Sequence, residues 1–312
     1  MGDFKEAISA QVRLERSKVK PYQGIVFLCG GNTDVRSPKP SSIRDAIYRE
    51  LVKISSIECR IKLAEDYKDW ANDAVYRDLV TFERHLAELS SLIVLVLESP
   101  GSIAELGLFS AIEAFREKLL VFIDSGHYNS SSFIRLGPID YLEKSFNNLA
   151  ECHAWIGREH GRERFDEDAA ETLQADLADA VTTRLGNPAK EQPFDHERWL
   201  HVALLICDLI NLFSALSIRE VRECLLRMGI EKEESEVRQT LFLLQKIGLI
   251  MLEPKGMQRF YVAADEHQFI KLHLETPTYD LDRFRSDVLA DYRRNDRKRF
   301  AAIQAVRERI AK

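Results

Sequence analysis

The sequence predicts an α/β fold in which an open, mainly parallel sheet carries helices on both faces, followed by a helical domain. Three runs of mostly apolar, partly β-branched residues, 24–29, 92–97 and 118–123, are typical of strands buried on both faces. Segments with the helical spacing of apolar residues separate these runs, and such alternation indicates a parallel sheet. From residue 195 the pattern changes to helices and one hairpin.

The elements of the first part follow in a regular order. Residues 1–20 are expected to form a helix or arm, and the strand over 24–29 ends at Gly30-Gly31-Asn32. The next elements are a helix over 43–54, a short strand over 58–63, a helix over 75–89, the strand over 92–97, a helix over 103–112 and the strand over 118–123. This part ends near residue 155, which predicts a first domain over 1–155.

The second part begins with a helical connector over 156–193, whose helix spans 163–185. Three helices follow, over 199–213, 218–228 and 233–247, and then a hairpin with strands over 249–253 and 257–263. This order is typical of a winged helix-turn-helix domain, which we expect over 194–270. Residues 271–312 are expected to form a basic C-terminal segment with one long helix from 279 onward.

Composition limits the classes of protein that fit. The 312 residues suggest two domains, and the formal net charge of −6 argues against nucleic-acid binding by the whole surface. We expect neither a signal peptide nor a membrane span, because the start is polar and the apolar runs are short. The cysteines have no metal-ligand spacing, so we expect no metal and reduced core thiols in a cytoplasmic protein: Cys29, Cys59, Cys152, Cys207 and Cys224.

Glu105 is the main candidate for chemistry. It follows a strand and a Ser99-Pro-Gly101-Ser102 turn, and its expected place is the first turn of a helix. Ligands bind at the carboxyl ends of strands in open α/β sheets, so a carboxylate there is a plausible nucleophile for sugar chemistry. The alternative is a capping box in which Ser102 is the N-cap and Glu105 only satisfies backbone amides.

Other polar groups are predicted near the same edge of the sheet. The turn Gly30-Gly31-Asn32 lets a phosphate or ribose approach the backbone, although it matches neither the GxGxxG nor the Walker A pattern and a plain tight turn is the alternative. The turn before the Glu105 helix is also predicted to bind the substrate, through Ser99, Gly101 and Ser102. Asp66 and Glu98 are acids near strand ends and complete the set of predicted substrate-binding residues.

Asp78 is the predicted second carboxylate. It lies one turn before Phe82, near the apolar stripe of its helix, so we expect it to face inward, with helix capping as the alternative. Two carboxylates at one cleft suit cleavage of a glycosidic bond through an oxocarbenium-like transition state. The nicotinamide of NAD⁺ departs as a neutral molecule without a general acid. A site in which the sequence identifies a nucleophile more clearly than a general acid therefore fits NAD⁺ at least as well as a nucleoside.

Three motifs resemble the nucleoside 2-deoxyribosyltransferase family. They are the strand followed by Gly30-Gly31-Asn32, Tyr76-Arg-Asp78-Leu79 at the start of a helix, and Pro100-Gly-Ser-Ile-Ala-Glu105-Leu-Gly107 after a strand. The resemblance implies a Rossmann-like fold, Glu105 as the nucleophile and Asp78 as an assisting acid. The family often carries a tyrosine at the end of its first strand, where this chain has Cys29 and Gly30, so hydrolysis is expected rather than transfer.

The order and length of both domains resemble the effector proteins of bacterial retron anti-phage systems. This resemblance implies a toxin that cleaves an N-glycosidic bond in a nucleotide, with NAD⁺ as the first candidate substrate and no cofactor. It also implies restraint by a retron reverse transcriptase with its multicopy single-stranded DNA joined to RNA. A homo-oligomer or higher-order assembly is expected as well.

Two charged regions concern nucleic acid. The third helix of the winged-helix region opens with Glu231, Glu233, Glu234 and Glu236, which would repel phosphates, so we expect this domain to dock on protein or ribonucleoprotein. The tail carries a predicted phosphate-contacting surface whose alternative is a basic helix on an acidic neighbour: Arg293, Arg294, Arg297, Lys298 and Arg299. The alternative function is a nucleotide-sensing regulator with a non-catalytic first domain and a DNA-binding winged helix.

Overall fold

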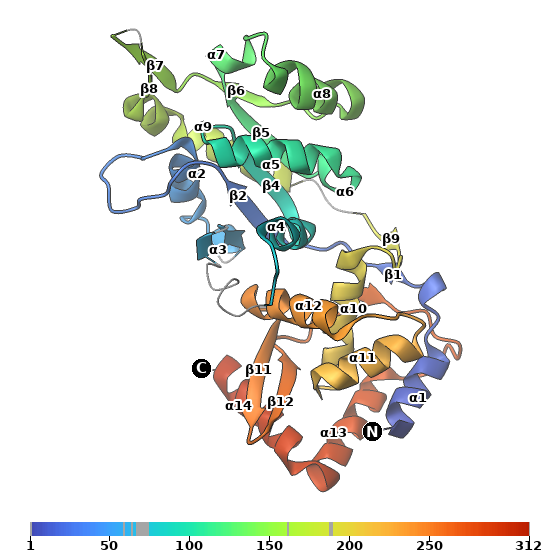
Figure 1. Ribbon diagram of the computed structural model, residues 1–312. Coiled ribbons are helices and arrows are strands. Elements are labelled where there is room, and N and C mark those ends of the chain that lie inside the picture. The colour runs from blue at the N-terminus through green and yellow to red at the C-terminus, as the bar shows by residue number, and fades with distance from the viewer. Residues whose placement is uncertain are drawn as a thin grey trace. The chain divides into compact units, whose positions relative to one another are not determined.

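The computed structural model describes residues 2–58, 60–63, 65–66, 75–160, 162–186 and 190–311. Contacts divide the chain into two units (Figure 1). Unit 1 contains residues 1–22, 69–78 and 189–312, and unit 2 contains residues 23–68 and 79–188. These boundaries differ from the predicted ones at both ends of the first domain, because the N-terminal segment packs with unit 1 and residues 156–188 pack with unit 2.

The five-stranded sheet of unit 2 is parallel throughout, as predicted. Its strand order is β3-β2-β4-β5-β6. The strands are β2 (Ile25–Cys29), β3 (Ile61–Lys62), β4 (Ser90–Val96), β5 (Leu119–Asp124) and β6 (Glu151–His153). The chain order reverses between β2 and β4, and a reversal of this kind opens a crevice at the carboxyl ends of the strands.

Helices cover both faces of this sheet. On one face, α2 (Ile43–Leu51) and α9 (Glu167–Leu185) share a core with alternate residues of the central strands, such as Val94 and Phe122. On the other face, α5 (Pro100–Ala111) crosses the sheet (Figure 1). Its Phe109 packs on Phe27 with ring centroids 6.3 Å apart. Each such buried side chain contributes roughly 1.5–3 kcal/mol. The period of two along the strands therefore divides their side chains between two cores.

The predicted connector is part of unit 2 and does not link two bodies as a free segment. Residues 156–165 form a hairpin of β7 (Ile156–Glu159) and β8 (Arg162–Phe165), and α9 buries its apolar stripe with the core of α2. The smaller elements of the unit are α3 (Ser55–Glu58), α4 (Leu79–Glu88), α6 (Glu113–Arg116), α7 (Ser125–Tyr128), the π-helical turn η3 (Arg135–Ile139) and α8 (Asp140–Phe146).

Unit 1 contains the predicted succession of helices and a hairpin. It comprises α10 (Trp199–Leu212), β10 (Ala215–Leu216), α11 (Ile218–Arg227), α12 (Glu234–Lys246), β11 (Ile250–Lys255) and β12 (Gln258–Ala263). The three strands pair in the order β10-β12-β11. The N-terminal α1 (Gly2–Gln11), the 3₁₀ turn η1 (Leu14–Arg16) and β1 (Lys18–Val19) also belong here, since β1 pairs with β9 (Gln192–Pro193) and β13 (Ile270–Lys271).

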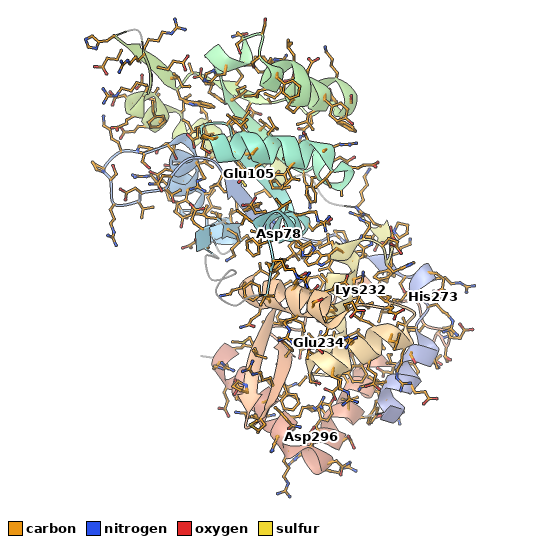
Figure 2. The ribbon with its side chains drawn as sticks, viewed as in Figure 1. Asp78, Glu105, Lys232, Glu234, His273 and Asp296 are labelled. Carbon is orange, nitrogen blue, oxygen red and sulfur yellow. The ribbon has the colours of Figure 1, made fainter. Side chains whose placement is uncertain are left out.

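The tail differs from the single long helix that was predicted. It forms α13 (Leu281–Asn295) and α14 (Arg297–Ile310), with a break at Asp296 (Figure 2). The carboxylate of Asp296 accepts a hydrogen bond from the backbone N–H of Arg299 at 3.1 Å and so caps the second helix. An aspartate in this role starts a new helix instead of continuing the old one.

The cysteines follow the prediction in part. Cys29, Cys207 and Cys224 are buried free thiols, but Cys152 is exposed, so its assignment to the core is wrong. It lies on the edge strand β6, where one side of the strand has no neighbour to cover it. Cys59 lies outside the described residues, as does most of the segment 64–74. No helix in the described part of the chain combines the length and the apolar character that a bilayer crossing requires.

Candidate active site

Glu105 is in the second turn of α5 and takes no part in capping it. The N-cap is Ser99, whose hydroxyl accepts from the backbone N–H of Ser102 at 3.1 Å, while the Ser102 hydroxyl accepts from the N–H of Ser99 at 3.2 Å. The predicted first-turn position and the alternative capping box are therefore both wrong. The helix starts earlier because Pro100 fits the first helical position, where its missing N–H has no cost.

The carboxyl group of Glu105 lies beside the end of β2 (Figure 2). The thiol of Cys29 donates a hydrogen bond to it, and one oxygen, Oε2, is buried without a hydrogen-bond partner among the described residues. Burial raises the pKa of Glu105, while the Cys29 hydrogen bond and the Arg44 guanidinium oppose the rise. The carboxylate thus has one oxygen that is not engaged in a hydrogen bond, in a place from which water is largely excluded.

Glu83 is a second carboxylate in this environment that our sequence analysis missed. Its side chain on α4 is only 8% exposed. Burial, reinforced by the negative charge of Glu105, raises the pKa of Glu83 to about 7. A signal was present, because Glu83 lies four residues after Leu79 and three before Leu86 on the apolar side of the predicted helix.

Arg44 and Glu65 complete the group, which we call the carboxylate cluster: Cys29, Arg44, Glu65, Glu83 and Glu105. The guanidinium of Arg44 forms a two-pronged ion pair with Glu65 and is 5% exposed. The positive charge of Arg44 therefore lies near the Glu105 carboxylate, although the ion-pair partner of Arg44 is Glu65. Nothing in the sequence marks Arg44, because its role depends on how α2 packs beside β2.

Asp78 does not have the predicted orientation. It is exposed, directly precedes α4 and belongs to unit 1, whereas Glu105 and Glu83 belong to unit 2 (Figure 2). The apolar stripe does not reach it because the helix begins one residue later. Its catalytic role remains a prediction. Asp66 is also exposed, and its carboxylate accepts from the backbone N–H of Leu63 at 2.9 Å in a local turn.

Glu98 fills the anion position at the glycine turn. Its carboxylate accepts from the backbone N–H groups of Gly31 at 2.8 Å, Ile43 at 2.8 Å and Arg44 at 3.0 Å. A Cβ on Gly31 would lie 2.9 Å from the Glu98 Oε1 atom, which explains the glycine. The Glu98 carboxylate thus occupies the position beside the glycine turn at which a ligand phosphate would bind.

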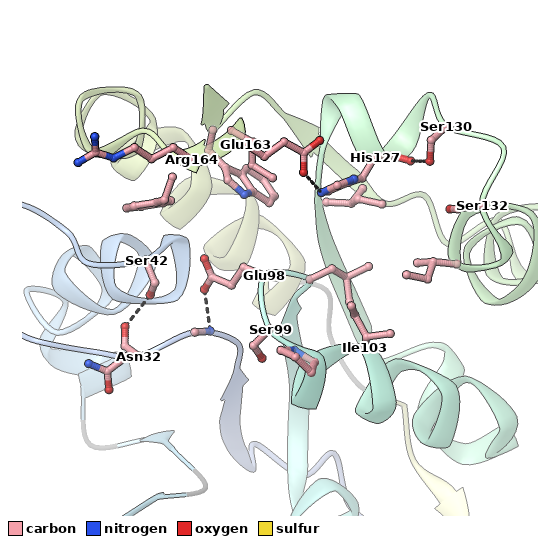
Figure 3. A pocket seen from close by; sticks show the side chains of 18 of the residues that line it. Asn32, Ser42, Glu98, Ser99, Ile103, His127, Ser130, Ser132, Glu163 and Arg164 are labelled. Carbon is pink, nitrogen blue, oxygen red and sulfur yellow. Dashed lines mark hydrogen bonds and ion pairs between the residues drawn. The ribbon is translucent and has the colours of Figure 1, made fainter. Parts of the chain in front are cut away.

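A cavity of about 670 Å³ lies at the carboxyl ends of β4, β5 and β6 (Figure 3). Four predicted substrate-binding residues line it: Gly31, Asn32, Glu98 and Ser99. Gly30, Gly101, Ser102 and Asp66 are not among its lining residues, and neither is Glu105. The structure therefore separates the predicted site into the cavity and the carboxylate cluster, and the start of α2 contributes to both: Ser41 and Ser42 line the cavity, and Arg44 belongs to the cluster.

The predicted basic surface is only partly a surface. Arg293, Arg294, Arg297 and Lys298 are exposed, but Arg299 is 6% exposed, so its assignment as a contact residue is wrong. Its guanidinium donates to both carboxylate oxygens of Glu220, at 2.7 and 2.9 Å, and to the carbonyl of Ala215 at 3.0 Å. The aromatic rings of Tyr292 and Phe260 lie 4.8 Å from it. Arg299 thus connects α14 to α11.

Comparison with known proteins places this combination of units in one family. The model of the STM3845 retron effector protein family matches residues 40–252, which is more than half of the chain. The chain belongs to this family. The retron effector match begins just before α2 and ends in β11, so it includes Arg44, Glu65, Glu83 and Glu105 of the carboxylate cluster but not Cys29.

Two curated relatives of this retron effector come from Escherichia coli. One, named "Retron Ec86 putative ribosyltransferase/DNA-binding protein", is 38% identical over 124 residues, which cover 39% of this chain and 38% of the relative. The other, named "Retron Ec73 putative ribosyltransferase/DNA-binding protein", is 33% identical over 135 residues, which cover 40% of this chain and 41% of the relative. The matched segments span about two fifths of the length of each relative.

Proposed function

We propose that this retron effector is an N-glycosidase that cleaves the glycosidic bond of a nucleotide, with NAD⁺ as the first candidate and Glu105 as the nucleophile. One observation carries the proposal: a half-buried carboxylate with an unpartnered oxygen has a second buried carboxylate in its electrostatic environment. Glycosidases commonly use a pair of carboxyl groups, one of which acts on the anomeric carbon while the other transfers a proton. The names of the two relatives, which include ribosyltransferase, support the same class of chemistry.

In the proposed reaction, Oε2 of Glu105 attacks the anomeric carbon C1′ as the C1′–N bond breaks. The electron pair of that bond leaves with nicotinamide, which departs as a neutral molecule, so this step needs no proton. The Cys29 thiol and the Arg44 guanidinium favour the ionised form of Glu105 that the attack requires. A ribosyl ester on Glu105 results.

Water then attacks C1′, and the C1′–O bond to Glu105 breaks. Ionised Glu83 accepts the proton of that water, a role for which a pKa of about 7 is well matched at neutral pH. The products are nicotinamide and ADP-ribose, Glu105 returns to its starting form, and Glu83 releases its proton to solvent. The reaction uses NAD⁺ as a substrate and requires no cofactor.

The test compares wild-type protein with Glu105→Gln, which keeps the shape of the side chain but removes the nucleophilic charge. We expect wild type to release nicotinamide from NAD⁺ and the variant to lose at least 10³-fold in rate, the order that removal of a nucleophile costs. Deoxynucleosides form the second substrate arm. Equal rates for the two proteins would refute the role of Glu105, and consumption of neither substrate, with or without the partner complex, would refute the enzyme.

We also propose that a retron reverse transcriptase and its RNA–DNA product restrain this activity and that the effector assembles with copies of itself. The exposed cations Arg293, Arg294, Arg297 and Lys298 at the junction of α13 and α14 are suited to nucleic-acid phosphates. Glutamate at Arg293 and Arg294 should weaken co-purification with the ribonucleoprotein at low salt. Unchanged co-purification would remove this surface from the proposal.

A nucleotide-sensing DNA-binding regulator is the second candidate. The relatives' names include DNA-binding, and unit 1 has helices followed by a hairpin. However, Glu231, Glu233, Glu234 and Glu236 are all exposed at the start of α12, where they would face phosphates in a major groove. A gel shift on duplex DNA at low salt decides: a shift abolished by charge reversal on the hairpin would favour the regulator, and no shift would exclude it.

A further inference from the structure

The cavity of unit 2 has the size of a site for a small organic molecule. Its volume of about 670 Å³ falls within the range of about 300–1,000 Å³ found for ligand pockets. The turn between β4 and α5 forms one wall, and α7, the approach to η3 and the β7–β8 hairpin form the others (Figure 3). The chemistry of these walls indicates what kind of molecule fits.

Every charged side chain that lines the cavity already has a partner. Glu98 accepts three backbone N–H groups, His127 lies 3.8 Å from Glu163, and Arg164 pairs with Glu159. The starts of α2 and α5, which could otherwise hold a phosphate, are occupied by Glu98 and by the hydroxyl of Ser99. An uncharged ligand is therefore favoured over a phosphate.

Three hydroxyl groups of the cavity present oxygen acceptors rather than protons, whereas that of Ser132 accepts from the backbone N–H of Arg135 at 3.2 Å. The hydroxyl of Ser42 donates to the carbonyl of Asn32 at 2.7 Å, that of Ser130 to the carbonyl of His127 at 2.7 Å, and that of Ser99 reaches the carbonyl of Gly30 at 3.3 Å. With these protons already used, the remaining lone pairs suit a ligand that brings N–H donors.

The rest of the wall is apolar. Ile103, in the first turns of α5, is 40% exposed although it belongs to the cavity wall (Figure 3). Ile134 lies before η3 and also lines the cavity, and Trp155 closes it with 1% exposure and an indole N–H that has no acceptor among the described residues. A ligand that matches this wall has flat apolar faces and an edge with amino donors and ring-nitrogen acceptors. An amino-substituted purine has both features.

We propose that this cavity binds the adenine-type base of the nucleotide whose glycosidic bond is cleaved at Glu105. The inference rests on the proposed function and specifies the substrate. The cavity and the carboxylate cluster both border the first turns of α2 and α5, because Ser42 and Arg44 belong to one helix start and Ile103 and Glu105 to the other. A nucleotide with its adenine in the cavity can thus keep its phosphates outside.

The experiment measures binding without turnover. Adenosine and uridine are titrated calorimetrically into full-length Glu105→Gln protein, alone and combined with Ile103→Glu, which places a further negative charge on the wall. Ile134→Glu repeats the test from another wall, and Ala111→Glu adds the same charge to the exposed end of α5 as the matched control. Melting curves establish that each variant is folded.

We expect adenosine to bind, uridine to bind at least tenfold more weakly, and either cavity variant to reduce adenosine affinity at least tenfold while Ala111→Glu leaves it unchanged. No adenosine binding, equal binding of uridine, or binding unaffected by both cavity variants would overturn the inference. Adenosine binding that depends on the cavity, together with consumption of neither NAD⁺ nor deoxynucleosides by wild type with or without the partner complex, would support the cavity and refute the proposed enzyme, so the two failures are distinguishable.

Discussion

Replacement of Glu83 by glutamine gives a quantitative test of the carboxylate cluster. Burial and the charge of Glu105 raise the pKa of Glu83 from 4.5 to about 7, so ionisation of this group opposes folding. A rise of about 2.5 pKa units corresponds to about 3 kcal/mol of folding free energy at 1.36 kcal/mol per unit. Glu83→Gln removes this cost because the amide does not ionise.

The direction of the pH dependence follows from the raised pKa. The folded protein holds the proton of Glu83 more tightly than the unfolded chain does, so the favourable contribution is complete below about pH 4.5 and is lost as the pH rises through about 7. Between pH 5 and pH 8, the stability of Glu83→Gln relative to wild type should therefore increase by about 2–3 kcal/mol.

The assay is hydrogen exchange of the amides of β4 and α5, which reports unfolding of unit 2 separately from unit 1. Glu113→Gln, an exposed carboxylate in the same unit, is the control and should show no comparable trend. A stability difference between Glu83→Gln and wild type that is independent of pH would show that Glu83 ionises normally, and the proposed proton acceptor would be lost with it.

Three further predictions concern other groups. Wild-type turnover of NAD⁺ should fall as the pH drops below about 7, because protonated Glu83 accepts no proton; a flat profile in that range would contradict this role. Arg299→Met should destabilise unit 1 by about 3–5 kcal/mol in urea unfolding because it removes the ion-pair partner of the largely buried Glu220 carboxylate, while exposed Lys298→Met should cost little. Gly31→Ala should lower the free energy of unfolding by about 1–3 kcal/mol, because its Cβ would meet the Glu98 carboxylate. Gly101→Ala is the control, since a Cβ there has its nearest contact at 3.8 Å. Equal melting temperatures for Gly31→Ala and Gly101→Ala would refute the argument.

The sequence alone determined the central strands β2, β4 and β5 with their intervening helices, the parallel sheet and the position of Glu105 beyond a buried strand, but not β6, the β7–β8 hairpin or the break between α13 and α14. These features follow from periodicity, because apolar runs and helical spacing record which faces of an element are buried. The family resemblance was carried by short motifs of the same local kind, and the family match confirmed the retron effector.

The tertiary structure decided which charges meet. Glu83 and Arg44 join Glu105, Glu98 turns back onto the glycine loop, and Arg299 is buried although its neighbours are exposed. None of these contacts is local, since each joins residues from separate elements whose distance depends on how helices pack on the sheet. A sequence pattern reports the face on which a residue lies, but the partner that it meets there is set by packing between elements.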